Sequence, residues 1–529
     1  MTPKKYVMKF PLWLLSGILY GLSWPIFESI NLSFLAWFAF VPLFLFLEKN
    51  KNNFWKSLLG CYAAMVIFGC LAAGWLFYFP QAKYQIAFIF FLEELWFFIP
   101  FLIFFPIQKK IGFNKALWLF PFIWTLWEWT YLNLEFTMGT HLSAYSQSNN
   151  LWLIQYLDIT GMWGVSFWLL LFNVLIFKAY QSSLYQFKSK QFYKKAGLVL
   201  VIMLGVPLVY GAISYSKYDA LDGKSIEVSI IPTQYTPRFL NDPANRISLV
   251  EETLYRTDEA DFAKSKSDKT TDLYIWPETG LPFTIQQGNL SELLFEAVTD
   301  WKASLLTGAR GISDTINAED KRIYVSGALF SHASKDITFH HKTVLTPGQE
   351  AIPYHEKLAK ISSFPIKKYD TRFYKKGKKS EALSLTTKDN QKFLIGVSLC
   401  FEQWYPKHWA ALARNGAEFY AHLAAEGWYG KVGFMNFMTN VTKMRSIENR
   451  KQTARAANVG ISGFIDQLGR IQTISEKGSL QIANAKLTAF NEVTTYAKQP
   501  NWFPIIILIT FLIMLLFQLY EHQFLKLLK

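Results

Sequence analysis

The stretch FLIGVSLCFEQWYP, residues 393–406, has the pattern of a short buried β-strand that ends on a cysteine. Its first part, Phe393–Leu399, is rich in Val, Ile and Leu, which favours a strand. Cys400 follows directly, and Phe401 and Glu402 come next. Residues at the carboxyl ends of strands in open α/β sheets commonly form the functional site. The stretch therefore predicts an α/β domain with Cys400 at a strand end.

Other short apolar runs in the same part of the chain have the length of strands. Helical stretches, Arg246–Ala263 and Phe437–Ala457, lie between some of them. Strands separated by helices predict a layered α/β fold. The predicted strands are Ser225–Ile231, Asp272–Trp276, Ser304–Ala309, Lys321–Leu329, Phe393–Leu399 and Glu418–Leu423.

The remainder of the chain is more apolar than an ordinary soluble enzyme. Of the 529 residues, 51% are hydrophobic and 17% aromatic, and the apolar ones crowd into 10–214 and 501–520. A membrane-spanning helix needs about 20 mostly apolar residues. We therefore expect a multi-pass α-helical membrane bundle of eight transmembrane helices. The predicted runs are 10–27, 31–47, 57–79, 86–107, 116–133, 160–177, 197–214 and 502–519.

The lysines predict the orientation of this bundle. They cluster before the first run and after the second, fourth and sixth, whereas residues 131–161 contain no Lys or Arg. By the positive-inside rule the amino terminus is cytoplasmic, and seven crossings place the α/β domain outside the cytoplasm. The predicted units are a seven-helix bundle (1–214), the outer domain (215–499), and a last transmembrane helix with a cytoplasmic tail (500–529).

The formal net charge of +15 does not indicate a nucleic-acid partner. The sequence has no basic groove motif, zinc finger or RNP-like strand, and many of its lysines flank the apolar runs. Its histidines show no metal-ligand spacing such as HExxH. We therefore expect neither nucleic acid, nor a metal, nor a cofactor.

Cys400 differs in context from the other two cysteines. Cys61 and Cys70 lie in an apolar run, which is typical of small buried hydrophobic residues. Cys400 stands alone outside the membrane runs, so no disulfide can form within its domain. A lone cysteine there is either a buried filler or a nucleophile.

Two further stretches favour the nucleophile. DLYIWPETG carries Glu278 just beyond an apolar strand, and HHKTVLTPGQEAIPY holds Lys342 with Glu350 eight residues on. A cysteine with a pKa near 8.5 needs a base or a cation beside it, and a buried carboxylate such as Glu278 can take the proton. A lysine ammonium can stabilise the negative charge that acyl transfer builds on a carbonyl oxygen. Glu350 is suited to hold that lysine charged and oriented.

The ordered set WPE, K-x2-L-x-P-x2-E and C-x-E resembles the nitrilase superfamily, whose Glu-Lys-Cys triad occurs in that order. Residues Met444–Asp466 (MRSIENRKQTARAANVGISGFID) and the amino-terminal GLSWP…FLAWFAFVPL within Gly21–Leu43 are similar to apolipoprotein N-acyltransferases. So is the plan of seven helices, an outer nitrilase-like αββα domain and a closing helix. The resemblance covers nearly the whole chain.

This resemblance implies an activity and a set of roles. The family moves an acyl chain from a membrane phospholipid to the enzyme's cysteine as a thioester, and then to the α-amino group of an S-diacylglyceryl cysteine at the amino terminus of an apolipoprotein. The expected partners are thus a phospholipid donor, an apolipoprotein acceptor and the membrane. By motif match, Glu278 is the base, Lys342 the oxyanion-stabilising cation and Cys400 the nucleophile. The supporting residues would be Glu350, Phe401 and Glu402.

The sequence departs from the family pattern at two places. Phe401 stands where the family usually has tyrosine, and Ala425 stands where it usually has asparagine, in LAAEGWYG. Both leave the triad intact and bear on substrate-loop details. The substrate-loop candidates are Trp404, Glu426 and Trp428.

Acidic residues inside the membrane runs cost free energy unless they are paired or hydrated. Glu93 and Glu94 lie in the fourth run and Glu128 in the fifth. One interpretation is hydrogen bonding within the bundle, and the other is a polar floor for a lipid headgroup or substrate amine below Cys400.

Two other functions compete with acyl transfer. The same triad hydrolyses C–N bonds when water takes the acyl group, which would make the chain a membrane-tethered amidase or nitrilase-type hydrolase. A non-catalytic membrane protein with a dead nitrilase domain is the third possibility. A hydrolase needs only a single anchor, so a bundle of eight spans favours a lipid substrate.

Overall fold

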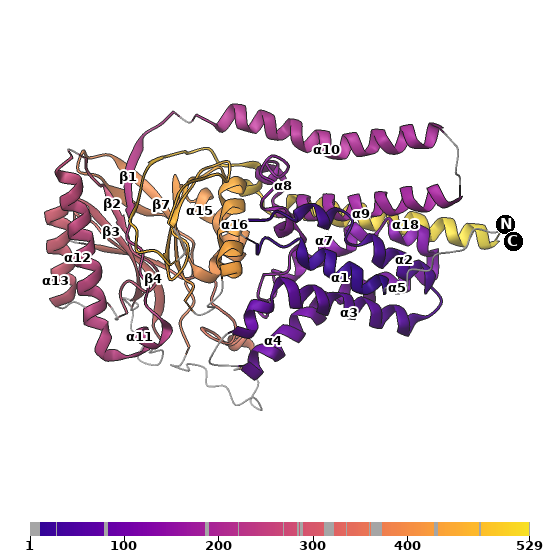
Figure 1. Cartoon of the computed structure of the whole chain (residues 1–529), viewed down its shortest axis with the longest axis horizontal. Coiled ribbons are helices and arrows are strands. Elements are labelled where there is room, and N and C mark those ends of the chain that lie inside the picture. Colours follow the sequence, from indigo (N-terminus) through magenta and orange to yellow (C-terminus); the bar gives the residue numbers. More distant parts are fainter. Residues whose placement is uncertain are drawn as a thin grey trace.

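The chain folds into a helical part and an α/β part that lie end to end (Figure 1). This computed structural model describes residues 11–27, 29–78, 83–185, 190–220, 222–267, 269–282, 285, 289–311, 322–334, 336–358, 360, 373–427, 432–475 and 478–527.

The helical part holds the first helices of the chain and the last one. Both ends of the chain lie at its far end, away from the α/β part (Figure 1). Its core is dominated by buried aromatic rings, such as Phe40, Phe120 and Trp124, whose centroids lie 5.1–5.9 Å apart. The helices are α1 (Leu12–Leu22), α2 (Val41–Lys49), α3 (Phe54–Ala72), α4 (Lys83–Trp96), α5 (Ile99–Ile111), α6 (Phe113–Leu117), α7 (Phe120–Tyr131), α8 (Leu157–Thr160), α9 (Met162–Tyr185), α10 (Lys190–Tyr218) and α18 (Trp502–Leu527).

Five helices in the described part of the chain are long and apolar enough to cross a membrane, against the eight expected. They cover Phe54–Ala72, Ile89–Ile111, Met162–Ser183, Lys194–Tyr218 and Trp502–Phe524.

The other three predicted runs form shorter helices. α1, α2 and α7 have 11, 9 and 12 residues, and 12 residues of α-helix rise only about 18 Å, against about 30 Å of hydrocarbon. Proline explains the shortening in part, since Pro42 and Pro121 sit in the first turn of α2 and α7, where proline marks a helix start.

The α/β part contains two six-stranded sheets. The first has the order β12-β1-β2-β3-β4-β5 and the second β11-β10-β9-β8-β7-β6. The strands are β1 (Ser225–Ile230), β2 (Leu273–Ile275), β3 (Ser304–Gly311), β4 (Tyr324–Phe330), β5 (Ile337–His341), β6 (Leu383–Thr386), β7 (Lys392–Leu399), β8 (Phe419–Ala425), β9 (Thr453–Asn458), β10 (Gly463–Ile465), β11 (Ile471–Ile474) and β12 (Ala483–Thr488).

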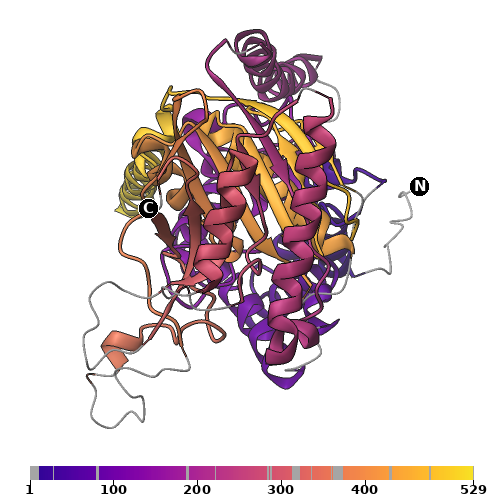
Figure 2. The ribbon, with the colours of Figure 1, turned by 90° about the vertical axis from the view of Figure 1, so that its left-hand side faces the viewer.

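The sheets pack face to face through one apolar layer. Ile230 and Ile275 of the first sheet share this layer with Val397 and Leu423 of the second, and all four are fully buried. Helices α12 (Arg246–Ser265) and α13 (Asn289–Trp301) cover the outer face of the first sheet (Figure 2). Helices α15 (Pro406–Arg414) and α16 (Val432–Asn449) lie on the second sheet's side, toward the helical part (Figure 1). The result is the expected nitrilase-like αββα sandwich.

All six predicted strands are present, with ends shifted by up to three residues. The predicted helix Phe437–Ala457 is wrong at its carboxyl end. The helix ends at Asn449, Arg450 turns the chain with a φ of 52°, and Thr453–Asn458 forms β9 between β8 and β10. The alanines here favour a helix by propensity. Pairing of the fully buried β9 on both of its sides overrides this propensity.

Candidate active site

Cys400 lies at the end of β7 and begins a 3-10 turn, Cys400–Trp404. Its φ of 41° is in the left-handed region, a strained conformation for a residue with a Cβ, and such strain gathers at functional sites. The side chain is partly exposed, and the backbone N–H of Ala425 donates to its sulfur. The turn thus presents the thiol at the strand end rather than burying it in the sheet.

Glu278 lies in the turn after β2, beside Cys400. The Cys400 thiol donates a hydrogen bond to the Glu278 carboxylate. The turn is held against β3, because the Gly308 N–H donates to the Pro277 carbonyl at 3.1 Å. Glycine is required at 308, since a Cβ there would lie 2.0 Å from the carbonyl oxygen of Glu278.

Lys342 directly follows β5 and lies between two carboxylates. Its Nζ donates to Oε1 of Glu278 at 3.1 Å and to Oε1 of Glu350 at 2.8 Å, and its side chain is only 1% exposed. The other oxygen of Glu350 accepts the Thr346 N–H at 2.7 Å. The structure therefore brings Glu278, Lys342, Glu350 and Cys400 into one constellation.

Burial and mutual contact set the protonation of this group. Burial raises the pKa of the Glu278 carboxyl, although Lys342 opposes the rise. Burial, reinforced by Glu278, also raises the pKa of the Cys400 thiol. For Lys342, burial alone would lower the pKa, but Glu278 and Glu350 raise it above its ordinary value. These directions favour a Cys400 thiol that keeps its proton and a Lys342 ammonium held by two carboxyl groups.

Glu402 connects the Cys400 turn to the segment after Lys342. Its Oε2 accepts the Leu399 N–H at 2.9 Å, and its Oε1 accepts the N–H of Thr343 at 2.6 Å and the N–H of Val344 at 3.2 Å. Burial acts to raise the pKa of Glu402, but the neighbouring His408 and His340 and the Leu399 N–H hold it well below its usual range. The side chain positions both catalytic segments without reaching the thiol.

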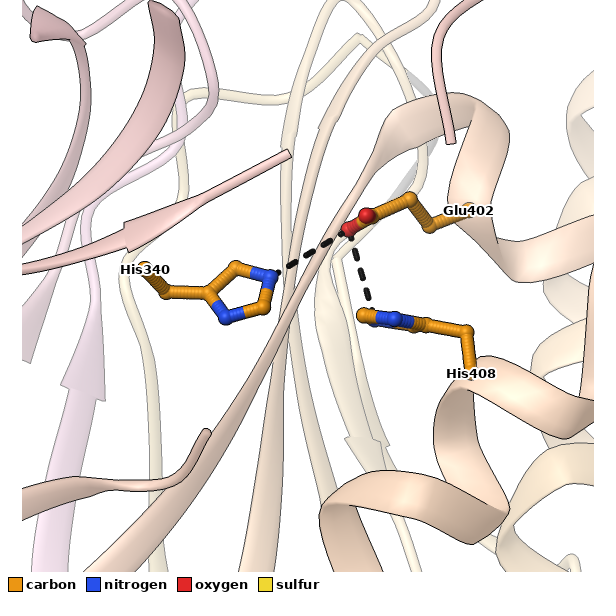
Figure 3. A group of neighbouring side chains, drawn as sticks. All are labelled: His340, Glu402 and His408. Atoms are coloured by element: carbon orange, nitrogen blue, oxygen red, sulfur yellow. Dashed lines mark ion pairs between the residues drawn. The ribbon is translucent and has the colours of Figure 1, made fainter. Parts of the chain in front are cut away.

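His340 and His408 flank Glu402 from two different elements (Figure 3). Their Nε2 atoms lie 3.7 and 3.3 Å from Oε2 of Glu402. In the described part of the chain these three residues are the group whose donor atoms come close enough to hold a metal ion. The carboxylate, however, already accepts from Leu399, Val344 and both the N–H and the hydroxyl of Thr343. This group fits a hydrogen-bond hub better than an ion site.

A small cavity of about 50 Å³ opens at Cys400. This space admits a few waters, so a long acyl chain carried by Cys400 would extend beyond it. Its wall combines Glu278, Glu350 and Cys400 with large apolar side chains from both parts of the chain. Those side chains are Trp75, Met138, Phe401, Trp404, Phe434 and Met438.

The three substrate-loop candidates have different surroundings. Trp404 is 2% exposed and packs edge to face with Tyr145 and at a tilt with Phe437, so it is a wall of the cavity rather than part of a solvent-exposed loop. Glu426 is fully buried in an ion pair with Arg455 and is not among the residues that line the cavity at Cys400. Trp428 lies outside the described residues.

The acidic residues of the membrane runs bond within the bundle. Oε1 of Glu128 accepts the N–H of Ser143 at 2.7 Å, and Glu94 pairs with His141 at 3.0 Å. Glu93 accepts the Tyr131 hydroxyl and, at 2.8 Å, the Met138 N–H. Internal hydrogen bonding is therefore the interpretation that fits. Because Met138 lines the cavity at Cys400, Glu93 also fixes one wall of that cavity.

Sequence reasoning missed several contributors. The group of Ala425 that donates to the sulfur is its backbone N–H, which no pattern of side chains reveals. His408 and Met138 come from segments with no recognisable motif. The only signal for Ala425 was its place in LAAEGWYG.

Comparison with known proteins finds matches to both parts of the chain. Residues 16–175 match the family described as "Apolipoprotein N-acyltransferase N-terminal domain", and residues 238–495 match "Carbon-nitrogen hydrolase". An apolipoprotein N-acyltransferase of Chlorobaculum tepidum is 31% identical over 93% of this chain and 93% of its own. Apolipoprotein N-acyltransferase 1 of Treponema denticola is 26% identical over 95% of each chain. An apolipoprotein N-acyltransferase of Geobacter metallireducens is 26% identical over 87% of this chain and 85% of its own.

Fold and site together define a membrane protein that carries a carbon–nitrogen hydrolase domain. Identity to the relative from Chlorobaculum tepidum extends along nearly the whole length of both chains, through the helical part and the α/β part alike. The chain belongs to the apolipoprotein N-acyltransferase family.

Proposed function

We propose that this protein transfers an acyl chain from a membrane phospholipid, through a thioester on Cys400, to the α-amino group of an S-diacylglyceryl cysteine at the amino terminus of an apolipoprotein. The observation that carries the proposal is the buried Lys342 ammonium, which is hydrogen-bonded to both Glu278 and Glu350. Of these two carboxylates, Glu278 is the one that accepts the hydrogen bond of the Cys400 thiol. This arrangement supplies a base, a nucleophile and a stabilising cation at one point.

In the first half-reaction Glu278 takes the proton of the Cys400 thiol, and the sulfur attacks the ester carbonyl of the phospholipid. The carbon–sulfur bond forms, and negative charge on the carbonyl oxygen is stabilised by the Lys342 ammonium and the backbone N–H of Phe401. The carbon–oxygen bond then breaks, and Glu278 returns the proton to the leaving lysophospholipid oxygen.

In the second half-reaction the amine of the acceptor attacks the thioester. Glu278 takes a proton from that amine as the carbon–nitrogen bond forms, and Lys342 again faces the oxyanion. The carbon–sulfur bond breaks, and the proton held by Glu278 returns to the sulfur of Cys400. The cycle is ping-pong, since lysophospholipid leaves before the acceptor reacts.

The membrane arrangement that goes with this chemistry is the one expected from the lysines. We propose eight spans, seven within 1–214 and one within 500–529, with 215–499 in the periplasm. The three shorter helices would cross together with their flanking turns. This orientation supports lipoprotein maturation because it puts the thiol on the outer side of the inner membrane, beside the lipid leaflet and the acceptor.

Intact-mass analysis of the purified protein after incubation with phosphatidylglycerol tests the proposal. We expect a fatty-acyl adduct that hydroxylamine removes and that Cys400→Ala lacks, and loss of the adduct when an S-diacylglyceryl peptide is added. A control variant, Cys70→Ala, should keep the adduct. If the adduct persists in Cys400→Ala, or is released to water as fast without the peptide, the proposed transfer is wrong.

A further inference from the structure

A second and much larger cavity adjoins the site, on the other side of the segment that follows Lys342. It measures about 700 Å³. One wall is Leu132–Glu135, directly after α7, and the other comes from the α/β part, within 344–357 and 374–378. The cavity thus opens where the helical part meets the α/β part.

The lining of this cavity is strongly basic. Among the described residues that line it are five with Lys or Arg side chains and one with a carboxylate, Glu135. The carboxylate is already used, because its Oε2 accepts the Tyr354 N–H at 2.6 Å, and the Glu135 N–H in turn donates to the Tyr354 hydroxyl at 3.2 Å. The cations are Arg322, Lys357, Lys375, Lys376 and Lys378.

Two of these lysines form no ion pair within the described part of the chain. Lys376 and Lys378 are exposed, and neither forms an ion pair with any described residue. Lys357 lies over the ring of Tyr354, 5.4 Å from its centroid. Several ammonium groups around one space repel one another unless an anion lies between them. The cavity is therefore suited to a ligand with negative charge.

The basic segment is bonded to the backbone of the catalytic constellation. The Tyr374 N–H donates to the carbonyl of Glu350 at 2.9 Å, and the Gly377 N–H donates to the carbonyl of Lys342 at 2.8 Å. Glycine is needed at 377, because a Cβ there would lie 2.3 Å from the carbonyl oxygen of His341. A ligand held by this segment has a fixed position relative to Lys342 and Glu350.

A ring pair separates the two cavities. Tyr405 lines the basic cavity and Phe401 lines the one at Cys400, and their centroids are 5.6 Å apart. A lysine and an aromatic ring also lie together at the end of α7, where the Lys407 ammonium is 5.6 Å from the centroid of the Trp129 ring. Aromatic residues gather where a membrane protein meets the headgroup layer, and cations near it attract anionic lipids.

We propose that this basic cavity binds the phosphodiester of the phospholipid acyl donor, with Lys357, Lys376 and Lys378 facing the phosphate while the ester carbonyl reaches Cys400. The assignment rests on the proposed function. Beyond that function, it assigns the place where the phospholipid donor is bound and names the phosphodiester as the part that the protein recognises. The ligand chemistry is a phosphate monoanion, available from a lipid headgroup or from free phosphate.

Binding to a protein that cannot turn over separates these sources. The probes are dihexanoylphosphatidylglycerol, dihexanoylglycerol, which lacks the phosphate, and inorganic phosphate, each titrated calorimetrically into Cys400→Ala in a maltoside detergent. Introducing Lys376→Gln and Lys378→Gln together into Cys400→Ala should raise the Kd for the phospholipid about tenfold or more. The reason is that each lysine near an anionic headgroup contributes about 1 kcal/mol to binding. The Kd for dihexanoylglycerol should not change.

The matched control is the pair Lys388→Gln and Lys392→Gln, two exposed lysines near the opposite end of β7 from Cys400, which should leave every Kd unchanged. An unchanged phospholipid Kd in the Lys376/Lys378 variant overturns the assignment, as does phospholipid that fails to bind Cys400→Ala at all. Inorganic phosphate that binds as tightly as the phospholipid through the same lysines would make the cavity a phosphate site and equally overturn it.

The acyl adduct on Cys400 of the unmodified chain is measured in parallel. If no adduct forms but the phospholipid still binds through Lys376 and Lys378, the proposed acyl transfer fails and the headgroup site stands. If the adduct forms and binding is independent of both lysines, the headgroup site fails and acyl transfer stands.

Discussion

The ammonium of Lys342 lies 3.1 Å from Oε1 of Glu278, with the two side chains 1% and 11% exposed. Two anionic groups, Glu278 and Glu350, share this one cation at the thiol. Its removal would leave two carboxylates repelling each other next to Cys400 and an oxyanion with no ammonium partner.

Lys342→Met should therefore slow both acylation and transfer by about a hundredfold or more, the usual effect of losing one oxyanion stabiliser. Single-turnover kinetics on detergent-purified protein measures both steps, and thermal unfolding checks the fold. If Lys342 only ties the Glu350 segment in place, the variant should instead fold poorly. A well-folded Lys342→Met enzyme that acylates at the normal rate would refute the proposed role.

Glu278 should give the acylation rate a distinctive pH dependence. The carboxylate accepts the thiol proton only when ionised, so the rate falls as pH drops through its pKa. Because burial raises that pKa, the acid limb should lie above the ordinary carboxyl range of about 4. Glu278→Gln should acylate slowly and lose this limb. A limb at ordinary carboxyl pH in the unmodified chain would contradict the assignment.

The triad could be predicted because each member follows a short apolar strand within a recognisable motif. Glu278, Lys342 and Cys400 follow β2, β5 and β7, two strands of one sheet and one of the other. What the sequence could not supply was the packing between these sheets. The Ala425 N–H at the sulfur depends on it, and so does the buried ion pair of Glu426 and Arg455.

Hydropathy identified the apolar runs but not where each helix begins and ends. The run 10–27 is helical only over Leu12–Leu22, after which the chain passes through Ser23-Trp24-Pro25. A hydropathy profile scores a proline only by its polarity and takes no account of the constraint that its ring places on the backbone. The prediction of a helix at β9 was wrong for a different reason. Helix propensity carries no information about pairing between distant strands.

The lysine distribution makes a prediction about topology that is independent of the chemistry. A reporter that is active only outside the cytoplasm should be active when fused after Asn241 and inactive when fused after Lys190, because α10 separates the two positions. Reporter activity and protease protection in spheroplasts both measure this. The reverse pattern would move residues 215–499 to the cytoplasm and remove the periplasmic site.

The last prediction concerns the joint between the helical and α/β parts. Arg450, just after α16, donates through Nε to Asp158 of α8 at 2.9 Å and through Nη1 to Gln155 at 2.6 Å. Its side chain is fully buried. Arg450→Met should lower the free energy of unfolding by about 3 kcal/mol or more, because it leaves the buried Asp158 charge without its arginine and with only the Tyr210 hydroxyl donating to it.

Denaturant unfolding of the purified protein measures this effect, with Lys217→Met as the matched control. Lys217 of α10 pairs with Glu492 at 3.2 Å across the same joint, but both side chains are exposed, so its loss should cost less than about 1 kcal/mol. Combining Arg450→Met with Asp158→Asn should cost less than the sum of the two single changes, since the neutral amide no longer strands a charge. Additive losses, or an Arg450→Met variant as stable as Lys217→Met, would show that this ion pair does not hold the two parts together.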